Sequence, residues 1–247
     1  MFPIRDHNPS GRTPYVTFAL IAINVLVFLA YFPSLNDYQL QEFYMTWGLV
    51  PAGFTSGFGP ETLLTSMFLH GGWMHLAGNM LFLWIYGDNL EEEMGHLGFL
   101  VFYLAAGAAA GMAQILPDPG SLIPMVGASG AIAGVMGGYL LLFPKAKVDV
   151  LFIFIIFFRI FAIPAWIVLG LWLGLQIFSG VATPGDAGGV AYWAHVGGFV
   201  AGLVLTVPVW LRRGAGRFWQ ETKGHPPHPE TRFEAARSNI PLVRRQR

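Results

Sequence analysis

Three stretches of this sequence carry side chains that could perform chemistry. Ser129 lies in "MVGASGAIAG", and His195 lies in "WAHVGGFVAG". His75 and Asn79 lie four residues apart in "HGGWMHLAGN", a spacing that puts both on one face of a helix. A serine hydroxyl together with an imidazole is the pairing of a nucleophile with a general base.

A purely structural role for Ser129 is the competing interpretation. Small residues recur at every fourth position in both segments: Gly130, Gly134 and Gly138 in the first, and Ala194, Gly198 and Gly202 in the second. Such stripes let membrane helices approach each other closely. Close packing of the two stripes would also bring Ser129 and His195 into contact, so the stripes are consistent with both interpretations.

Other chemistries fit these residues less well. No Asp or Glu lies in the interior of an apolar segment, which argues against an aspartyl dyad. His70 and His75 are five residues apart with no Glu between them, unlike the His-Glu-x-x-His pattern of zinc proteases. No acid is placed to orient a histidine, so a Ser–His dyad without metal or cofactor is favoured over a triad with Asp186. A small transporter or channel lined by His75, Asn79 and His195 stays open as an alternative.

The composition indicates a membrane protein. Of the 247 residues, 54% are hydrophobic and 11% are charged, whereas soluble domains carry roughly 25% charged residues. The formal net charge is zero, so there is no general attraction to nucleic acid. The chain contains no Cys, which excludes disulfides, thiolate metal sites and cysteine nucleophiles.

Six apolar segments approach the length of about 20 residues that a transmembrane helix needs. The predicted spans are 14–32, 73–88, 97–116, 127–143, 160–180 and 190–211. Only helices satisfy the backbone within one lipid-exposed segment, so we expect an all-α polytopic membrane protein built as a six-helix bundle. The second and fourth spans are short. No internal repeat relates the segments, which argues against a transporter.

Lys and Arg indicate how the chain is oriented. The segments expected in the cytoplasm are 1–13, 89–96, 144–159 and 212–247, and the expected outer loops are 33–72, 117–126 and 181–189. All 14 Lys and Arg residues fall in the first set, and positive charge marks the cytoplasmic side. We therefore expect a short cytoplasmic segment 1–13, a helical domain 14–211 and a flexible, basic cytoplasmic tail 212–247.

This orientation brings the candidate residues to one depth. At ~1.5 Å per residue, Ser129, His75, Asn79 and His195 all lie within roughly the outer third of the membrane. Two stretches remain outside the spans. Residues 148–159 are apolar but too short to cross, and we expect them to be buried against the inner interface. The outer loop 33–72 mixes apolar and polar residues, which favours short interfacial helices.

In these motifs the chain resembles the rhomboid family of intramembrane serine proteases over residues 14–211. The resemblance rests on "HGGWMHLAGNM", "GDNLEEEMGHLGFLVFYLAAG", "GASG" and "AHVGGFVAG", in this order. It implies a six-helix core whose active site lies in a water-filled cavity open to the outside. It also implies substrates that are single transmembrane helices, passing sideways by the fifth helix, with 181–189 as a mobile cap.

The resemblance assigns roles to individual residues. Ser129 would be the nucleophile and His195 the general base. The oxyanion hole would be formed by His75, Asn79 and the Ser129 backbone N–H. Gly127 would keep the loop before Ser129 small, and His70 would be structural, bonding within the outer loop.

The chain departs from some family members at two positions. A Tyr four residues after the serine is replaced by Ala133, which leaves open how the His195 ring is held. The first outer loop has Trp47 but lacks the Arg of a Trp-Arg pair. An inactive rhomboid-like protein that binds membrane clients is the main alternative to a protease. The expected location is a bacterial-type plasma membrane, and the oligomeric state is not readable from the sequence.

The predicted orientation can be tested with single cysteines, because the chain has none of its own. In intact cells, an impermeant maleimide is expected to label cysteines in the loops 33–72, 117–126 and 181–189. Cysteines in the tail 212–247 are expected to react only after the membrane is permeabilised. Labelling of the tail but not of the loops in intact cells would overturn the orientation.

Overall fold

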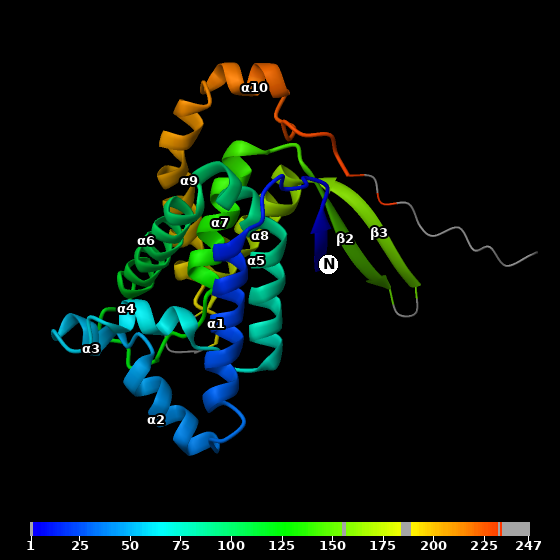
Figure 1. Cartoon of the computed structure of the whole chain (residues 1–247). Helices are drawn as coiled ribbons and strands as arrows, with labels where there is room; N and C mark the ends of the chain where they lie inside the picture. Colours follow the sequence, from blue (N-terminus) through cyan, green and yellow to red (C-terminus); the bar gives the residue numbers. More distant parts are fainter. Residues whose placement is uncertain (1, 155–156, 184–188, 232, 234–247) are drawn as a thin grey trace, which may run out of the picture.

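The computed structural model describes residues 2–154, 157–183, 189–231 and 233, with the helices gathered into one bundle (Figure 1). Six helices coincide with the six predicted spans: α1 (Tyr15–Tyr31), α5 (Trp73–Met94), α6 (His96–Ile115), α7 (Ser129–Leu142), α8 (Ala165–Ala182) and α9 (Tyr192–Arg212). Among the described residues, α6, α8 and α9 are long and apolar enough to cross a membrane, and α1 and α7 are apolar but shorter.

Helix lengths confirm one of the two expected short spans and correct the other. Helix α7 has 14 residues, as its apolar run predicts. Helix α5 has 22 residues, because it continues through a polar stretch to Met94. The predicted span, 73–88, covers only the apolar part of α5. The helix continues beyond it because polar side chains of its last turns, such as Glu91 and Glu93, have hydrogen-bond partners.

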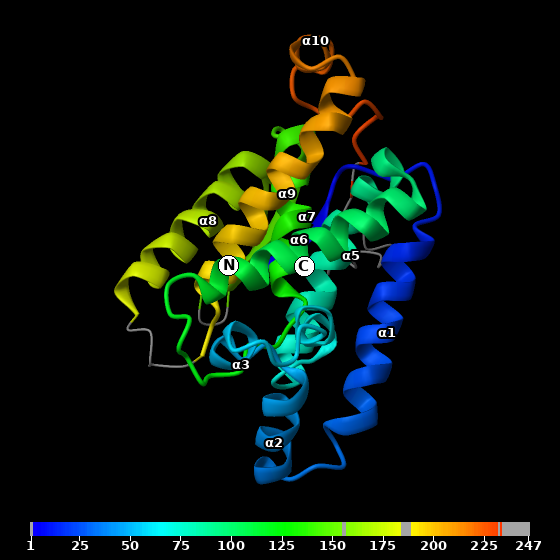
Figure 2. The ribbon, with the colours of Figure 1, turned by 90° about the vertical axis from the view of Figure 1, so that its left-hand side faces the viewer.

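Helix α7 forms the centre of the bundle. Every residue from Gly130 to Tyr139 is buried, and a helix that is apolar on all sides belongs in the interior. Helices α5, α6 and α9 pack around it. Helices α8 and α9 lie side by side, whereas α1 lies on the opposite flank (Figure 2).

The outer loop forms the short helices that its mixed composition predicts: α2 (Asp37–Trp47), α3 (Pro51–Thr55), α4 (Thr62–Thr65) and a 3-10 turn at Ser66–Phe68. Helix α2 begins with a reciprocal cap between Asn36 and Gln39, which satisfies two free N–H groups of its first turn. Helices α2 and α3 lie at one end of the molecule, and α10 (Gly216–Thr222) lies at the other (Figure 1).

The protein is mostly helical, but the prediction of an all-α protein missed a three-stranded antiparallel sheet among the described residues. Strand β2 (Lys147–Phe154) pairs with β3 (Phe157–Pro164) as a hairpin and with β1 (Phe2–Asp6) on its other edge. The sheet stands beside the helices (Figure 1). A short run of β-branched and aromatic residues cannot be assigned to strand or buried helix by pattern alone. The fifth helix consequently begins at Ala165, five residues later than the predicted span.

Ion pairs tie strand β2 to the N-terminal segment and to the tail. Asp149 on β2 accepts hydrogen bonds from Arg5 Nε at 2.7 Å and from the His7 ring at 2.8 Å. Burial by itself would raise the pKa of the Asp149 carboxyl, but the His7 and Arg5 contacts outweigh burial and hold that pKa below its usual value. Lys147 contacts Glu230 of the tail at 2.7 Å.

The first part of the expected flexible tail therefore has fixed contacts. Arg213 makes a two-pronged hydrogen bond to Glu93 at 2.6 and 2.7 Å, and Trp219 on α10 donates to the Leu141 carbonyl at 3.0 Å. Residues 234–247 lie outside the described residues.

The "GDNLEEEMG" motif holds the start of α1. Both carboxylate oxygens of Glu91 are used, accepting hydrogen bonds from the Val16 and Thr17 N–H groups and from the Thr17 hydroxyl at 2.7–2.8 Å. The first N–H groups of a helix have no partner within the helix. Glu91 supplies that partner and a negative charge at the positive end of the helix.

Asp6, at the end of β1, carries a partly buried carboxyl group that contacts α7. The Tyr139 hydroxyl donates to Asp6 Oδ2 at 2.6 Å. Burial raises the pKa of Asp6 to about 7, although the Tyr139 and Asn8 hydrogen bonds and His7 oppose the shift. Between about pH 4 and pH 7, Asp6 therefore stays protonated in the folded protein, whereas an exposed Asp, with a pKa of about 4, is ionised.

This proton predicts how stability changes with pH. Because the pKa of Asp6 is higher in the folded state, its contribution to stability is complete below about pH 4 and is lost as pH rises through about 7. Asp6→Asn mimics the protonated form and should raise the melting temperature at pH 8 by a few degrees, with little effect at pH 4. Thermal unfolding in detergent from pH 4 to pH 8 measures this. The exposed Asp37→Asn is the control, and identical pH slopes for wild type and Asp6→Asn would contradict the assignment.

Candidate active site

The two predicted small-residue stripes face each other, and α7 and α9 approach until their backbones touch. A Cβ placed on Gly198 would lie 2.1 Å from the Gly130 carbonyl oxygen, and one on Gly202 would lie 2.0 Å from the Gly134 carbonyl oxygen. Contacts this short exclude any side chain. The predicted packing of the stripes is confirmed, and it sets the distance between the helices that carry Ser129 and His195.

Ser129 and His195 meet at the N-terminal ends of these helices. Ser129 is the first residue of α7, and His195 lies in the first turn of α9. Ser129 Oγ is 2.8 Å from His195 Nε2. This is the distance at which a hydroxyl donates its proton to a neutral imidazole, and it is the geometry that a nucleophile and its general base need.

His75 contributes a hydrogen-bond donor beside Ser129. Its Nδ1 accepts the Gly71 N–H at 3.2 Å, so in the neutral ring the proton lies on Nε2. That nitrogen points toward Gly127, where a Cβ would lie 2.8 Å from it. His75 therefore presents an N–H group to the space in front of the serine.

Asn79 contributes a second donor from the next turn of α5. The side chain is 7% exposed, and its Nδ2 has no hydrogen-bond partner among the described residues. A buried amide without a partner costs free energy. An unpaired donor that lines a cavity is therefore a group available to a ligand.

Gly127 is required for both steric and conformational reasons. Its φ is +133°, a region that residues with a side chain rarely adopt. A Cβ here would lie 2.8 Å from the His75 ring and 3.5 Å from Ser129 Oγ. The Gly127 N–H donates to the Ser66 carbonyl at 2.9 Å, which fixes the loop immediately before α7.

His70 lies in the loop before α5, and its main-chain groups hydrogen-bond two tyrosine hydroxyls. The Tyr31 hydroxyl donates to the His70 carbonyl at 2.7 Å and accepts from the His70 N–H at 2.7 Å, and Tyr44 donates to the same carbonyl at 2.9 Å. The ring is fully buried against His75, with centroids 5.1 Å apart. Burial lowers the pKa of His70 to about 3, with a further contribution from His75, so the ring is neutral.

A cavity of about 490 Å³ connects the predicted residues. Its wall includes His75, Asn79, Ser129 and His195, together with apolar side chains such as Phe82, Met136 and Trp172. These four predicted residues therefore come from three helices, α5, α7 and α9, to a single cavity. A drug-sized ligand or a short stretch of peptide is of the size that such cavities hold.

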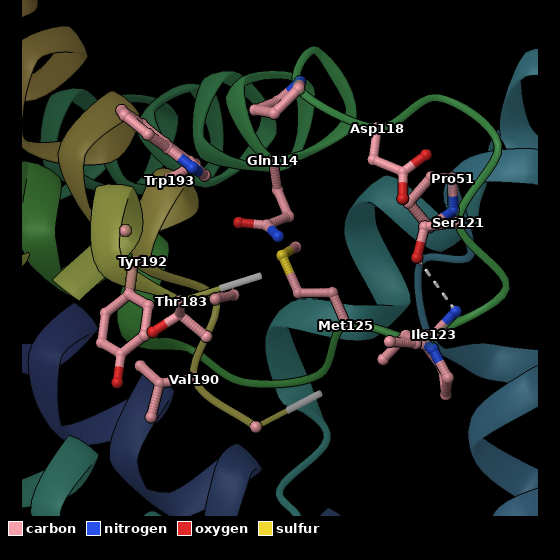
Figure 3. Close-up of a pocket in the computed structure, with 15 residues that line it drawn as sticks. Pro51, Gln114, Asp118, Ser121, Ile123, Met125, Thr183, Val190, Tyr192 and Trp193 are labelled. Carbon is pink, nitrogen blue, oxygen red and sulfur yellow. Dashed lines mark hydrogen bonds between the residues drawn. The ribbon is translucent and has the colours of Figure 1, made fainter. Parts of the chain in front are cut away.

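A smaller pocket of about 100 Å³ adjoins this cavity and shares wall residues from Pro124 to Met125 and from Gly189 to Ala191. Figure 3 shows Gln114 and Met125 approaching each other inside it, with Tyr192 and Thr183 on one side and Asp118 and Ser121 on the other. Gln114 Oε1 accepts the Ala194 N–H at 3.0 Å, which anchors the start of α9 next to His195.

Two residues that the sequence analysis missed hold the His195 ring. Gln176 Oε1 is 2.8 Å from His195 Nδ1, and the Trp172 ring lies 5.7 Å from the His195 ring at an angle of 36°. They support the His195 ring in place of the Tyr that some family members carry at the position of Ala133. A signal was available, because Gln176 is a polar side chain within an apolar span, and such residues are functional candidates. Asp186 and most of the expected cap lie outside the described residues.

Comparisons with known proteins agree with the motifs. A family model described as the Rhomboid domain matches residues 59–212. The chain is 36% identical to the rhomboid protease GluP of Bacillus subtilis over 146 residues, which cover 59% of this chain and 26% of that protein. It is 31% identical over 202 residues to the mitochondrial rhomboid protein 1 of Saccharomyces cerevisiae, covering 76% of this chain and 51% of that protein.

The human presenilin-associated rhomboid-like protein, which is mitochondrial, is 30% identical over 175 residues, covering 68% of this chain and 44% of its own length. The chain thus spans between about a quarter and a half of the length of these relatives. Their names place them in a bacterium and in mitochondria, so they give no support to the expected bacterial-type plasma membrane.

The contact between α7 and α9 predicts the effect of filling it. Gly198→Val should push the two helices apart, because its side chain would occupy the position of the Gly130 carbonyl. The melting temperature in detergent should fall by several degrees, and any activity that depends on the Ser129–His195 contact should fall with it. Gly170→Val on α8 is the matched control, since a Cβ at Gly170 meets nothing within 4 Å. Equal melting temperatures for both variants would contradict the packing argument.

Proposed function

Since the chain belongs to the rhomboid family, we propose that it is an intramembrane serine endopeptidase that cleaves transmembrane helices of substrate proteins with a Ser129–His195 dyad. The observation that carries the proposal is the 2.8 Å contact between Ser129 Oγ and His195 Nε2 in the wall of a cavity. A serine that served only for packing would need no imidazole partner.

The atoms define the steps of the reaction. The Ser129 hydroxyl attacks a peptide carbonyl while His195 Nε2 takes the hydroxyl proton, and the carbonyl oxygen becomes an oxyanion. His195 then donates that proton to the leaving amine as the C–N bond breaks, which leaves an acyl group on Ser129. Water attacks the acyl carbon while His195 accepts a water proton. The bond between the acyl carbon and Ser129 Oγ then breaks, His195 returns the proton to Oγ, and the carboxylic acid product leaves.

Three donors are candidates for binding the oxyanion. His75 presents Nε2–H, Asn79 has an unpaired buried Nδ2, and the Ser129 N–H belongs to the first turn of α7, where no intrahelical partner exists. The positive end of the α7 dipole points to the same place. In serine proteases, removal of one oxyanion donor lowers the rate by about 10²–10³.

We propose six membrane spans with both termini on the cytoplasmic side. The charge distribution supports this orientation, because all 14 Lys and Arg lie in the expected cytoplasmic segments. Ion pairs also join β1 to β2 and β2 to Glu230 of the tail, and α10 lies opposite α2 and α3 (Figure 1). The active site then opens to the outer side, where water for deacylation is available.

An inactive client-binding protein is the second candidate function. A protein that only held client helices would not need a serine, its base and two oxyanion donors on one cavity wall. The cavity also carries more apolar than charged groups, which suits an unwound segment of a membrane helix rather than a soluble peptide. These observations favour cleavage.

The test uses Ser129→Ala, because alanine is as small as serine and leaves the packing intact. The purified wild type should react with a fluorophosphonate probe and cut a model transmembrane substrate in detergent or in vesicles. Ser129→Ala should keep the wild-type melting temperature and lose both reactions. Full cleavage by Ser129→Ala would end the assignment of the nucleophile.

Two further variants separate the base from the oxyanion donors. His195→Ala should leave no measurable cleavage, since His195 is the base hydrogen-bonded to Ser129 Oγ and the nearby His75 carries its proton on Nε2. Asn79→Ala should lower kcat by about 10²-fold and leave residual activity, because His75 and the backbone N–H remain. Equal and total losses would show that this division of roles is wrong.

A further inference from the structure

Gln176 lies on the side of His195 opposite Ser129. Its Oε1 is 2.8 Å from Nδ1, while Ser129 Oγ is 2.8 Å from Nε2. Both ring nitrogens of His195 are therefore hydrogen-bonded, one from α8 and one from α7. The ring has no freedom to rotate without breaking one of the two bonds.

The protonation of the ring follows from what each partner can do. A general base must offer the lone pair of Nε2 to the serine hydroxyl, so in the neutral ring the proton must lie on Nδ1. That proton needs an acceptor, and the carbonyl oxygen of an amide side chain is one. We propose that Gln176 is the positioning residue that fixes His195 in the Nδ1–H tautomer, a deduction that rests on the proposed protease function.

A neutral partner suits this environment. In serine triads a carboxylate accepts the Nδ1 proton and stabilises the imidazolium, but an ionised carboxylate in the membrane interior is costly. A half-buried amide supplies the same geometry without a charge to desolvate. The expected consequence is orientation of the base with less stabilisation of the imidazolium than an acid would give.

The contact also makes the base depend on the position of α8. Trp172 lies one turn before Gln176 on the same face, and its ring contacts both His195 and Phe199 of α9. Elsewhere α8 is loosely held, since Ala165 and Leu169 are its only buried residues among those described. Movement of α8 away from α9, as sideways passage of a substrate would require, would remove the acceptor from His195.

The kinetic test compares two substitutions of Gln176 that differ in whether they keep an acceptor for the Nδ1 proton. Gln176→Leu has nearly the same volume but no acceptor, and kcat should fall roughly 10-fold with KM little changed. Gln176→Glu keeps an acceptor and adds a charge that stabilises the imidazolium, so it should retain more activity than Gln176→Leu. It should also move the acidic limb of the kcat/KM profile to higher pH.

The matched control is Gln114→Leu. Gln114 also hydrogen-bonds α9, but through the Ala194 N–H and not through the catalytic ring. It should lower the melting temperature without changing the shape of the pH profile. If Gln176→Leu keeps the wild-type kcat and pH profile in a protein whose Ser129→Ala variant is inactive, the positioning role is wrong and the protease function stands.

A readout that does not require turnover completes the test. Imidazole ¹⁵N chemical shifts, with the His195 signals identified by their loss in His195→Ala, distinguish the two neutral tautomers. The wild type should show the Nδ1–H form, and Gln176→Leu should shift toward the Nε2–H form. An Nε2–H ring in the wild type would overturn the proposal, and this result would be independent of whether any substrate is cut.

Discussion

The direct backbone contact between α7 and α9 is the constraint on which the rest of the molecule depends. Glycines at positions 130, 134, 198 and 202 leave no room for a side chain between these helices. The dispersion and packing contacts of such an approach replace the hydrophobic effect that is absent between helices in lipid. Since Ser129 and His195 lie at the matching ends of the two helices, the same contact sets their separation to a hydrogen bond. The close approach of α7 and α9 therefore accounts both for the glycines between the helices and for the contact between Ser129 and His195.

The polar groups of the candidate site and the acidic residues elsewhere in the molecule are stabilised in different ways. The candidate site is built from neutral groups: a hydroxyl, two amides and imidazoles that hydrogen-bond one another or face a cavity. Away from the site, four acidic residues pair with Arg, Lys, His or free helix N–H groups: Glu91, Glu93, Asp149 and Glu230. Charges in a low-dielectric interior need such partners. Uncharged donors and acceptors suit a site in a low-dielectric interior, and the ion pairs lie away from the cavity.

His195 connects three helices that otherwise have different roles. Helix α9 carries it, α7 brings the serine to its Nε2, and α8 brings Gln176 and Trp172 to the other side of the ring. The alanine at position 133 leaves space above the ring that a larger residue would fill. Support from α8 takes its place, and that support comes from a helix with few buried side chains. The orientation of the His195 ring is therefore linked to the helix of the bundle with the fewest buried side chains.

The sequence by itself determined the helices that coincide with the six apolar segments, because apolar length and the need to pair every backbone group in lipid leave few alternatives. It also identified the glycine stripes and the Ser129, His195, His75 and Asn79 set, because polar and small residues stand out against an apolar background. Only the tertiary structure decided that residues 147–164 form a hairpin that pairs with the N-terminal strand, since short apolar runs have no distinctive period and the paired residues are 142 to 149 positions apart in sequence. Only the tertiary structure placed Gln176 at the His195 ring, because a contact between two helices depends on their rotation, which no local pattern specifies.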